Sequence, residues 1–201
     1  MNTLRNFVLI GTLMVSMAAS AQQPPLSALE TVEQGVLLLL DTVQKSRPLF
    51  LTDQERYFAE VENALSTIVD FDAVARVVMS RYSDAASEQQ VAKFGNILKT
   101  TLTRFYGAAL VSYSGEEPAF MPSTNPNSDP RADTIVGMEL SSGDSGSIKL
   151  QYQMFLNGND EWKLKNISLG GINLGRQYYT QFAAAMSQHN DDIDQVLNNW
   201  Q

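Results

Sequence analysis

The stretch from Ser147 to Leu174 constrains the fold most, because apolar and polar residues alternate along its first half. A period of two is typical of a strand with one buried face. The apolar positions are Ile148, Leu150, Tyr152, Met154 and Leu156, and the polar ones are Lys149, Gln151 and Gln153. Residues 157–160 read Asn-Gly-Asn-Asp, which tolerate positive φ and predict a hairpin turn. The chain is therefore built around an antiparallel sheet with one wide, mostly aliphatic face.

The returning strand changes face at Asn166. Before it, Trp162 and Leu164 occupy even positions, whereas Ile167 and Leu169 occupy odd ones. Such a change predicts a bulge, or a strand that is packed against other elements on both of its faces. The following Gly170-Gly171 pair permits close packing or a sharp bend.

Capping boxes predict where three helices begin, since each pairs Ser or Thr with Glu or Gln three residues later. The pairs are Ser27 with Glu30, Thr52 with Glu55, and Ser87 with Gln90. The first helix must end by Arg47, because Pro48 follows. A further helix over 73–82 follows Asp70-Phe71-Asp72, so four helices are expected before any sheet.

The helix that begins at Ser87 is expected to be the longest, with an apolar stripe at helical spacing. The stripe contains Phe94, Ile97, Leu98, Leu102, Phe105, Ala109 and Tyr113. Residues 115–130 hold four prolines and predict a loop with one short edge segment around Phe120. A strand over 133–140, the hairpin, a helix over 174–188 and a last helix capped by Asn190 complete the chain. Helices segregated from an antiparallel sheet predict the α+β class.

Residues 1–21 have the pattern of an export signal. Arg5 supplies a short positive region, residues 7–17 are an apolar run, and Ala19-Ser20-Ala21 fits the cleavage pattern. We expect residues 22–201 to form one mature domain in the bacterial periplasm. The chain has no cysteine, a net charge of −8 and only 14 Lys and Arg residues, which argues against nucleic-acid binding.

The motifs that could indicate an enzyme or a metal site lack the additional residues that such a site requires. Residues 143–146 read Gly-Asp-Ser-Gly, but Ser145 lies in a predicted turn and the sole histidine, His189, lies far downstream. A serine nucleophile needs a positioned base, so a plain turn is the better interpretation and no catalytic residue is predicted. His189 lacks zinc co-ligands, and the acidic cluster at 191–194 lacks the glycine and distal glutamate of a calcium loop. No metal or cofactor is predicted.

The apolar faces of the predicted helices and sheet are the remaining features that could explain a function. The helical stripes and the sheet face either meet as a solid core or stand apart around an apolar ligand, and the pattern of residues leaves both possibilities open.

Short matches along most of the mature chain resemble the MlaC family, also called the toluene-tolerance auxiliary family. They comprise Asp70-Phe71, Ala75-Arg76, Tyr82, Ala86-Ser87, Gln89 or Gln90, Phe94, Tyr106, Leu110, Ile148, Leu150, Tyr152, Trp162-Lys163, Gly171-Ile172-Asn173-Leu174, Tyr178 and Phe182. The chain departs from the family pattern at Ser80, Ser83, Asn173 and Tyr179, so no headgroup or partner contact is transferred from those positions.

The resemblance implies an α+β domain similar to an NTF2-like roll, in which helices cover a curved sheet and lipid tails enter the gap. It further implies a monomeric periplasmic phospholipid carrier, with lipid as cargo and no enzymatic activity. Its partners would be an inner-membrane ABC transporter complex (MlaFEDB-like) and an outer-membrane lipoprotein complex (MlaA-like), in a system that maintains outer-membrane lipid asymmetry. A periplasmic hydrolase, or a structural interaction domain with a solid core, is the alternative.

Residues on the predicted buried faces are the candidates for contact with lipid. They are Phe105, Tyr106, Val136, Met138, Ile148, Leu150, Tyr152, Met154, Trp162 and Leu164. Cations considered for the mouth of the pocket are Arg76, Arg81, Arg104 and Arg176, although a solvated or paired surface position is the better explanation of each.

Overall fold

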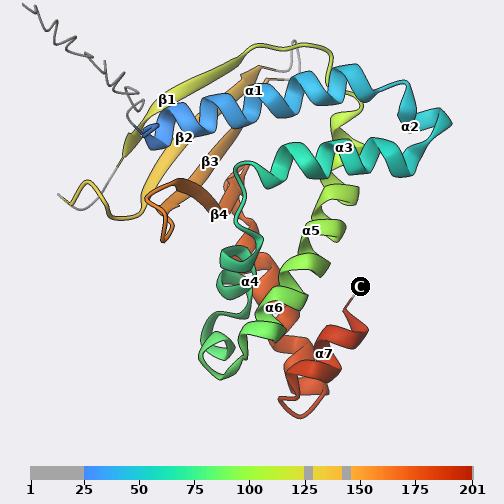
Figure 1. The fold of residues 1–201 in the computed structure, drawn as a ribbon, viewed down its shortest axis with the longest axis vertical. Coiled ribbons are helices and arrows are strands. Elements are labelled where there is room, and N and C mark those ends of the chain that lie inside the picture. The colour runs from blue at the N-terminus through green and yellow to red at the C-terminus, as the bar shows by residue number, and fades with distance from the viewer. Residues whose placement is uncertain (1–24, 125–128, 142–145, 201) are drawn as a thin grey trace, which may run out of the picture.

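The computed structural model describes residues 25–124, 129–141 and 146–200. The predicted signal peptide at 1–21 and the predicted turn at Ser145 lie outside the described residues. Helices occupy the first half of the described chain, and a sheet followed by two helices occupies the second (Figure 1). The helices before the sheet are α1 (Ala28–Ser46), α2 (Leu49–Thr52), α3 (Gln54–Ser66), α4 (Phe71–Met79), the 3-10 helix η1 (Ser80–Ala85) and α5 (Glu88–Leu110).

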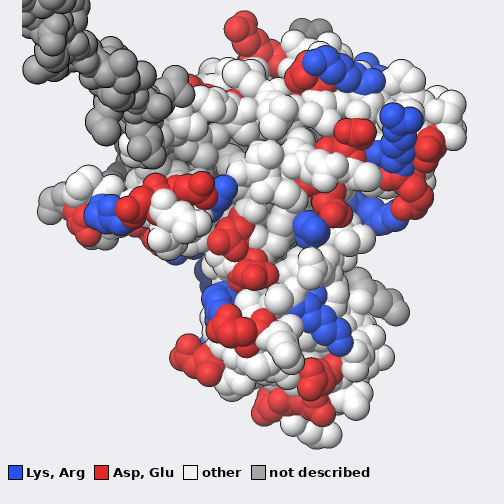
Figure 2. Space-filling model, in the orientation of Figure 1, with Lys and Arg blue, Asp and Glu red and all other residues white. Residues whose placement is uncertain are grey.

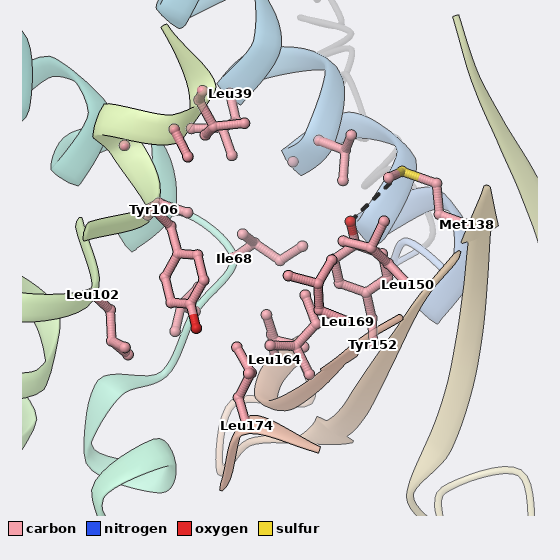
Figure 3. A pocket seen from close by; sticks show the side chains of 18 of the residues that line it. Leu39, Ile68, Leu102, Tyr106, Met138, Leu150, Tyr152, Leu164, Leu169 and Leu174 are labelled. Atoms are coloured by element: carbon pink, nitrogen blue, oxygen red, sulfur yellow. Dashed lines mark hydrogen bonds between the residues drawn. The ribbon is translucent and has the colours of Figure 1, made fainter. Parts of the chain in front are cut away.

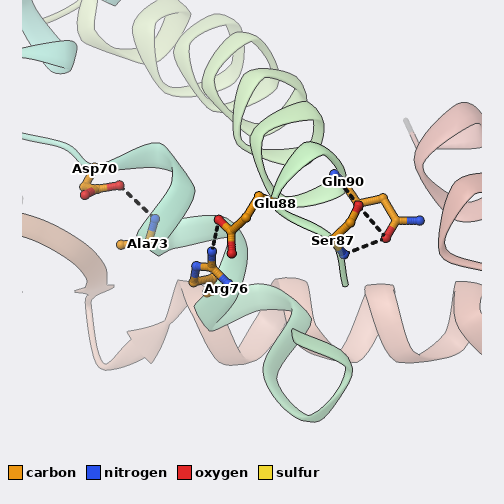
Figure 4. Close-up of polar contacts among 6 residues, drawn as sticks. All are labelled: Asp70, Ala73, Arg76, Ser87, Glu88 and Gln90. Atoms are coloured by element: carbon orange, nitrogen blue, oxygen red, sulfur yellow. Dashed lines mark hydrogen bonds and ion pairs between the residues drawn. The ribbon is translucent and has the colours of Figure 1, made fainter. Parts of the chain in front are cut away.

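Two of the predicted capping boxes are confirmed. Ser27 begins α1 and exchanges hydrogen bonds with Glu30, and Ser87 begins α5 and does the same with Gln90 (Figure 4). Such pairs satisfy backbone N–H groups that a helix start leaves without a partner. As expected from Pro48, α1 ends at Ser46. The carboxylate of Asp70 similarly accepts the Ala73 N–H at 2.8 Å and starts α4.

The predicted cap at Thr52 is wrong. Thr52 is the last residue of the short α2, and the carboxylate of the next residue, Asp53, accepts the Arg56 N–H at 3.2 Å to start α3. The helix over 73–82 is also shorter than predicted at its end, because Ser80 takes a φ of 49° and breaks α4. The chain then tightens into η1, so more helical segments precede the sheet than the four expected.

The last two helices are α6 (Leu174–Gln188), at the predicted bounds, and α7 (Ile193–Asn199). Asn190 does not cap α7. It takes a φ of 53° and Asp191 a φ of 61°, so both residues turn the chain. The carboxylate of Asp192 accepts the Gln195 N–H at 3.1 Å and is the cap.

The sheet is antiparallel, with the strand order β1-β2-β3-β4-β5. Its strands are β1 (Pro118–Thr124), β2 (Thr134–Ser141), β3 (Ser147–Leu156), β4 (Trp162–Leu169) and β5 (Ile172–Asn173). The edge segment expected around Phe120 is β1, whose position at the edge tolerates its two prolines, Pro118 and Pro122. The antiparallel sheet covered by helices confirms the α+β class.

The predicted change of face in β4 is a bulge. Gln153 pairs with Asn166 and the next residue, Met154, pairs with Leu164, so Lys165 has no partner in the ladder. The extra residue returns Ile167 to the face that Leu164 occupies, because it shifts the alternation by one position. Gly170 and Gly171 then take φ values of 56° and 85° and form the sharp bend into β5.

Three apolar clusters hold these elements together. One joins α4, α5, α6 and α7 around Phe94 and Phe182, and a second joins α1 and α3 around Tyr57. The third packs α1 on the inner face of the sheet, with Val32 against strands that carry Val136 and Met154. In Figure 1, α1 lies along the sheet, α4, α6 and α7 extend below it, and α5 runs from that lower end up to α3. Within the described residues, the structure contains no helix with the length and apolarity that a membrane crossing requires.

Candidate functional site

A cavity of about 470 Å³ lies between the sheet and the surrounding helices. This volume is within the range of roughly 300–1,000 Å³ that small-molecule sites occupy. Its lining is almost entirely aliphatic and aromatic. Among the residues that form it are Gly35, Val36, Leu39 and Leu40 of α1, Leu65, Ile68 and Val69 before α4, Val74 and Val78 of α4, Leu98, Leu102 and Tyr106 of α5, and Leu174 and Tyr178 of α6.

The sheet wall of the cavity follows from strand register. Met138 of β2 pairs with Leu150 of β3, and Leu150 pairs with Leu169 of β4. Residues that pair directly share a face of the sheet, so all three point toward the cavity. Tyr152 with Ile167, and Leu140 with Ile148, extend the same surface. Figure 3 shows Met138, Leu150, Tyr152, Leu164 and Leu169 gathered on the sheet side.

The opposite wall comes from helices. Leu98, Leu102 and Tyr106 recur every four residues along α5 and therefore lie on one face of that helix. In Figure 3, Leu102 and Tyr106 face the sheet residues across the cavity, with Leu39 of α1 above them and Leu174 of α6 below. Gly35 lets α1 pack closely on the turn before α4, since a Cβ there would lie 2.8 Å from Cδ1 of Ile68.

Asn166 is a polar residue in this apolar lining, and its amide is fully used. Its Oδ1 accepts the N–H groups of Ile167 at 2.9 Å and Gly175 at 3.0 Å. Its Nδ2 donates to Gln153 Oε1 at 3.3 Å and Asn173 Oδ1 at 3.1 Å. A satisfied amide carries little penalty for burial. Asn166 therefore ties the β4 bulge to the start of α6 and leaves the cavity wall without an unpaired polar group at this point.

Two tyrosines of the lining are held neutral. Burial, together with the neighbouring Tyr178 hydroxyl, raises the pKa of Tyr106 to about 12. Burial alone raises the pKa of Tyr152, whose hydroxyl donates to Met138 Sδ at 3.6 Å. A phenolate would lose its hydration in such surroundings. Among the described residues that line the cavity, Glu116 is the only one with a charged side chain.

The structure brings six of the predicted lipid-contact residues into the cavity lining. They are Tyr106, Met138, Ile148, Leu150, Tyr152 and Leu164. Whether they contact a lipid stays a prediction.

The other predicted contact residues lie outside the lining. Phe105 is 67% exposed and points away from the cavity, because it is one residue out of phase with Leu98, Leu102 and Tyr106. Val136 and Met154 are each 0% exposed and pack between α1 and the sheet, in the part of that cluster that does not line the cavity. Trp162 packs against the same cluster and is half-buried.

Sequence reasoning missed the contribution of α1, α4 and α6 to this surface. Leu39, Ile68, Val74 and Leu174 line the cavity, but none was among the predicted contact residues. Helical apolar stripes were the available signal, although a stripe does not say whether it meets a core or a cavity.

The arginines considered for the mouth do not line the cavity. Arg76 pairs with Glu88 at 2.5 Å (Figure 4), and Arg104 pairs with Glu55 at 2.5 Å. Arg81 lies over the Tyr82 ring and donates to its hydroxyl at 2.7 Å, and Arg176 is exposed. Figure 2 shows basic side chains beside acidic ones, and no single basic patch forms on this face.

The residues weighed for metal binding are explained by helix ends. His189 is the C-cap residue that follows α6, and Asp192 and Asp194 are the N-cap and a first-turn residue of α7. Over 25–124, 129–141 and 146–200, no group of three or more His, Asp and Glu side chains is arranged to hold a metal ion.

Comparisons with known proteins agree with this architecture. The sequence family described as "MlaC protein" matches residues 34–201. The toluene tolerance protein ttg2D of Pseudomonas putida is 26% identical over 172 residues, which cover 85% of this chain and 78% of that protein. The fold is similar to that of a phospholipid-binding protein from Ralstonia solanacearum, solved in complex with a phospholipid. The TM-score is 0.75 at 22% identity, over 86% of this chain and 94% of that chain.

Proposed function

This chain belongs to the MlaC family, and from that premise we propose that it binds a phospholipid in the cavity between its helices and its sheet. The cavity itself is the observation that carries the proposal. Its lining is apolar on both walls, burial holds Tyr106 and Tyr152 neutral, and its polar Asn166 is satisfied internally. Apart from Glu116 and two serines near one end, such a surface has few groups for a polar substrate, and it suits acyl chains.

Energetics favour enclosure of the tails. A diacyl lipid exposes on the order of 30 CH₂ groups to water, at roughly 0.8 kcal/mol each. A carrier that crosses water must therefore cover most of them, whereas the headgroup can remain hydrated. Met138 is a flexible, polarizable side chain in the wall that adapts to tails of different shape.

We place this activity in transport. The protein would be exported by a signal peptide at residues 1–21, act in the periplasm as a single domain over 22–201, and carry lipid between an outer-membrane lipoprotein complex and an inner-membrane ABC transporter complex. The MlaC family match and the similarity to a toluene tolerance protein support this role. A carrier needs no catalytic group, and none is assigned.

Organic extraction of the purified protein, followed by mass spectrometry, tests the binding proposal. We expect phospholipid close to one molecule per chain or more in the wild type, and a large loss in Leu150→Glu. Protein that is folded but free of lipid, and that takes up none from vesicles, would contradict the proposal and favour a structural interaction domain. Transfer of labelled lipid between two vesicle populations then tests carriage itself.

A further inference from the structure

The open end of the cavity is marked by the exposed residues of its lining. Within the described chain these are Ala109, Ser112, Ser141 and Ile148, while the remaining lining residues are buried or half-buried. Ala109 lies in the last turn of α5 and Ser112 just beyond it. Ser141 ends β2, and Ile148, which is 44% exposed, lies near the start of β3. These residues form the mouth.

Glu116 belongs to the same region. The strand that follows it begins with Pro118, which pairs with Leu140 beside Ser141. Its carboxylate is fixed locally, since Oε1 accepts the Ser114 hydroxyl at 2.6 Å and Oε2 accepts the Ser114 N–H at 3.1 Å. The Tyr113 hydroxyl donates to the Glu116 carbonyl at 2.6 Å and holds the backbone. These hydrogen bonds to Ser114 lower the pKa of Glu116, so the carboxylate is ionised at neutral pH.

No cation of the described chain shares the lining with Glu116. Two cations lie near this segment by sequence or contact, and neither forms an ion pair with Glu116 in the described structure. The guanidinium of Arg47 donates to the Tyr113 carbonyl. Lys149 pairs across the strands with Glu139, and alternation directs both toward the face of the sheet opposite the cavity. Glu116 is therefore the only charged side chain in the described lining, and no ion pair between described residues neutralises it, whereas the Arg47 charge lies outside the lining at the Tyr113 backbone.

We propose that Glu116 determines headgroup preference, favouring phospholipids whose headgroup carries an ammonium over those with a net negative charge. This inference rests on the proposed function. With the tails in the cavity, the headgroup lies at the mouth, where an ammonium is attracted by the carboxylate and a second negative charge is repelled. Phosphatidylethanolamine represents the favoured class and phosphatidylglycerol the disfavoured one. Burial of the apolar tails supplies the affinity, and Glu116 determines which headgroup is preferred.

A competition experiment tests this preference. Delipidated protein is incubated with vesicles that contain equal amounts of phosphatidylethanolamine and phosphatidylglycerol with matched acyl chains, and the bound lipids are extracted and quantified. We expect the wild type to hold phosphatidylethanolamine in about three- to tenfold excess, the range given by one partly screened charge contact. Glu116→Gln should bring the ratio close to one, and Glu116→Lys should invert it.

Glu117→Gln is the matched control, because Glu117 is the adjacent residue, is exposed and does not line the cavity. It should keep the wild-type ratio. Equal ratios in the wild type and Glu116→Gln, with normal total lipid, would overturn the inference and leave the proposed function standing. A wild-type preference for phosphatidylglycerol would overturn it as well. Absence of bound phospholipid from the folded wild type would instead refute the proposed function.

Discussion

The two ends of the inner sheet face have similar sequences and different surroundings. At one end Val136 and Met154 are 0% exposed, packed in one cluster with Ala28 and Val32 of α1. At the other end, Leu150 and Ile148 face the cavity, and Ile148 is 44% exposed. The four sheet residues are apolar and lie on the same side of the strands. The alternation of apolar residues thus determines which face of the sheet is buried. The positions of the helices determine whether they pack directly on that face or leave a cavity.

The helix α1 covers both ends and changes its role along its length. Its first turns, with Ala28 and Val32, close on the sheet, whereas Gly35, Val36 and Leu39 line the cavity. Across the cavity the sheet faces Leu102 and Tyr106 of α5 (Figure 3). We therefore treat Met154 as a marker of the solid end and Leu150 as a marker of the open end.

The largest contrast is expected when a carboxylate is placed at each end. In Met154→Glu the charge has no water and no partner, so it must be protonated or left unpaired, which costs on the order of 4 kcal/mol or more. We expect little folded protein. In Leu150→Glu the residue is half-buried beside the cavity, so the fold should survive and the bound lipid should be lost.

Circular dichroism and lipid extraction measure both outcomes. Gln151→Glu is the control for Leu150→Glu, because Gln151 is the next residue, is exposed and is not in the cavity lining. It should keep both fold and lipid. A folded Met154→Glu variant that has lost its lipid would reverse our assignment of the two ends.

Truncation to alanine should give a smaller contrast in the same direction. Met154→Ala removes packed atoms from a solid cluster and should lower the free energy of unfolding by about 2–5 kcal/mol. Leu150→Ala enlarges a cavity that already exists, so in delipidated protein its cost should be below about 1 kcal/mol. Urea unfolding with equal slopes for both variants makes the comparison valid. Equal losses would mean that Leu150 is packed as tightly as Met154.

Sequence patterns located the sheet face and its bulge but not the boundary between its two ends. Val136 and Met138 have the same alternation phase and similar side chains, yet only Met138 lines the cavity. The boundary depends on where α1 and α5 lie, and that is a long-range property. Phe105 and Tyr106 were both predicted as contact residues, and only Tyr106 lines the cavity, because a stripe with spacings of three and four fits either residue.

Local signals were stronger where one side chain contacts its own backbone. Ser27 and Ser87 each have a partner three residues later and form the expected caps. Thr52 and Asp53 are adjacent residues that can both cap, and the short α2 helix before them decides in favour of Asp53. The turn at Asn190 and Asp191 likewise moves the start of the last helix to Asp192.

Removal of lipid should have a moderate effect that depends on the open end. A ligand that binds only the folded state stabilises it by about 2.7 kcal/mol at a free concentration one hundred times its Kd. The loaded wild type should therefore melt several degrees above the delipidated form, whereas Leu150→Glu should gain nothing from added lipid. Calorimetry on matched samples measures the difference. Identical melting temperatures for loaded and empty wild type would indicate that the cavity holds no ligand in solution.

The smallest effect concerns the tyrosines at alkaline pH. Burial, with a contribution from Tyr178, raises the pKa of Tyr106 from 10.0 to about 12. The folded state thus retains a proton that the unfolded state loses, and this contribution to stability is present below pH 10 and disappears as the pH rises through 12. Tyr106→Phe should remove the corresponding part of the fall in stability, as followed by unfolding at a series of pH values.

Lipid loading should distinguish two tyrosines of the cavity lining, half-buried Tyr106 and the more deeply buried Tyr152. Tyr106 is half-buried, so acyl chains that displace water around it should raise its pKa further. Tyr152 is 7% exposed and donates to Met138, so loading should change its pKa much less. Near-ultraviolet titration of tyrosinate in Tyr106→Phe and Tyr152→Phe, each with and without lipid, separates the two contributions. A lipid-dependent shift that persists in Tyr106→Phe and vanishes in Tyr152→Phe would put the acyl chains at the sheet side of the cavity, away from α5.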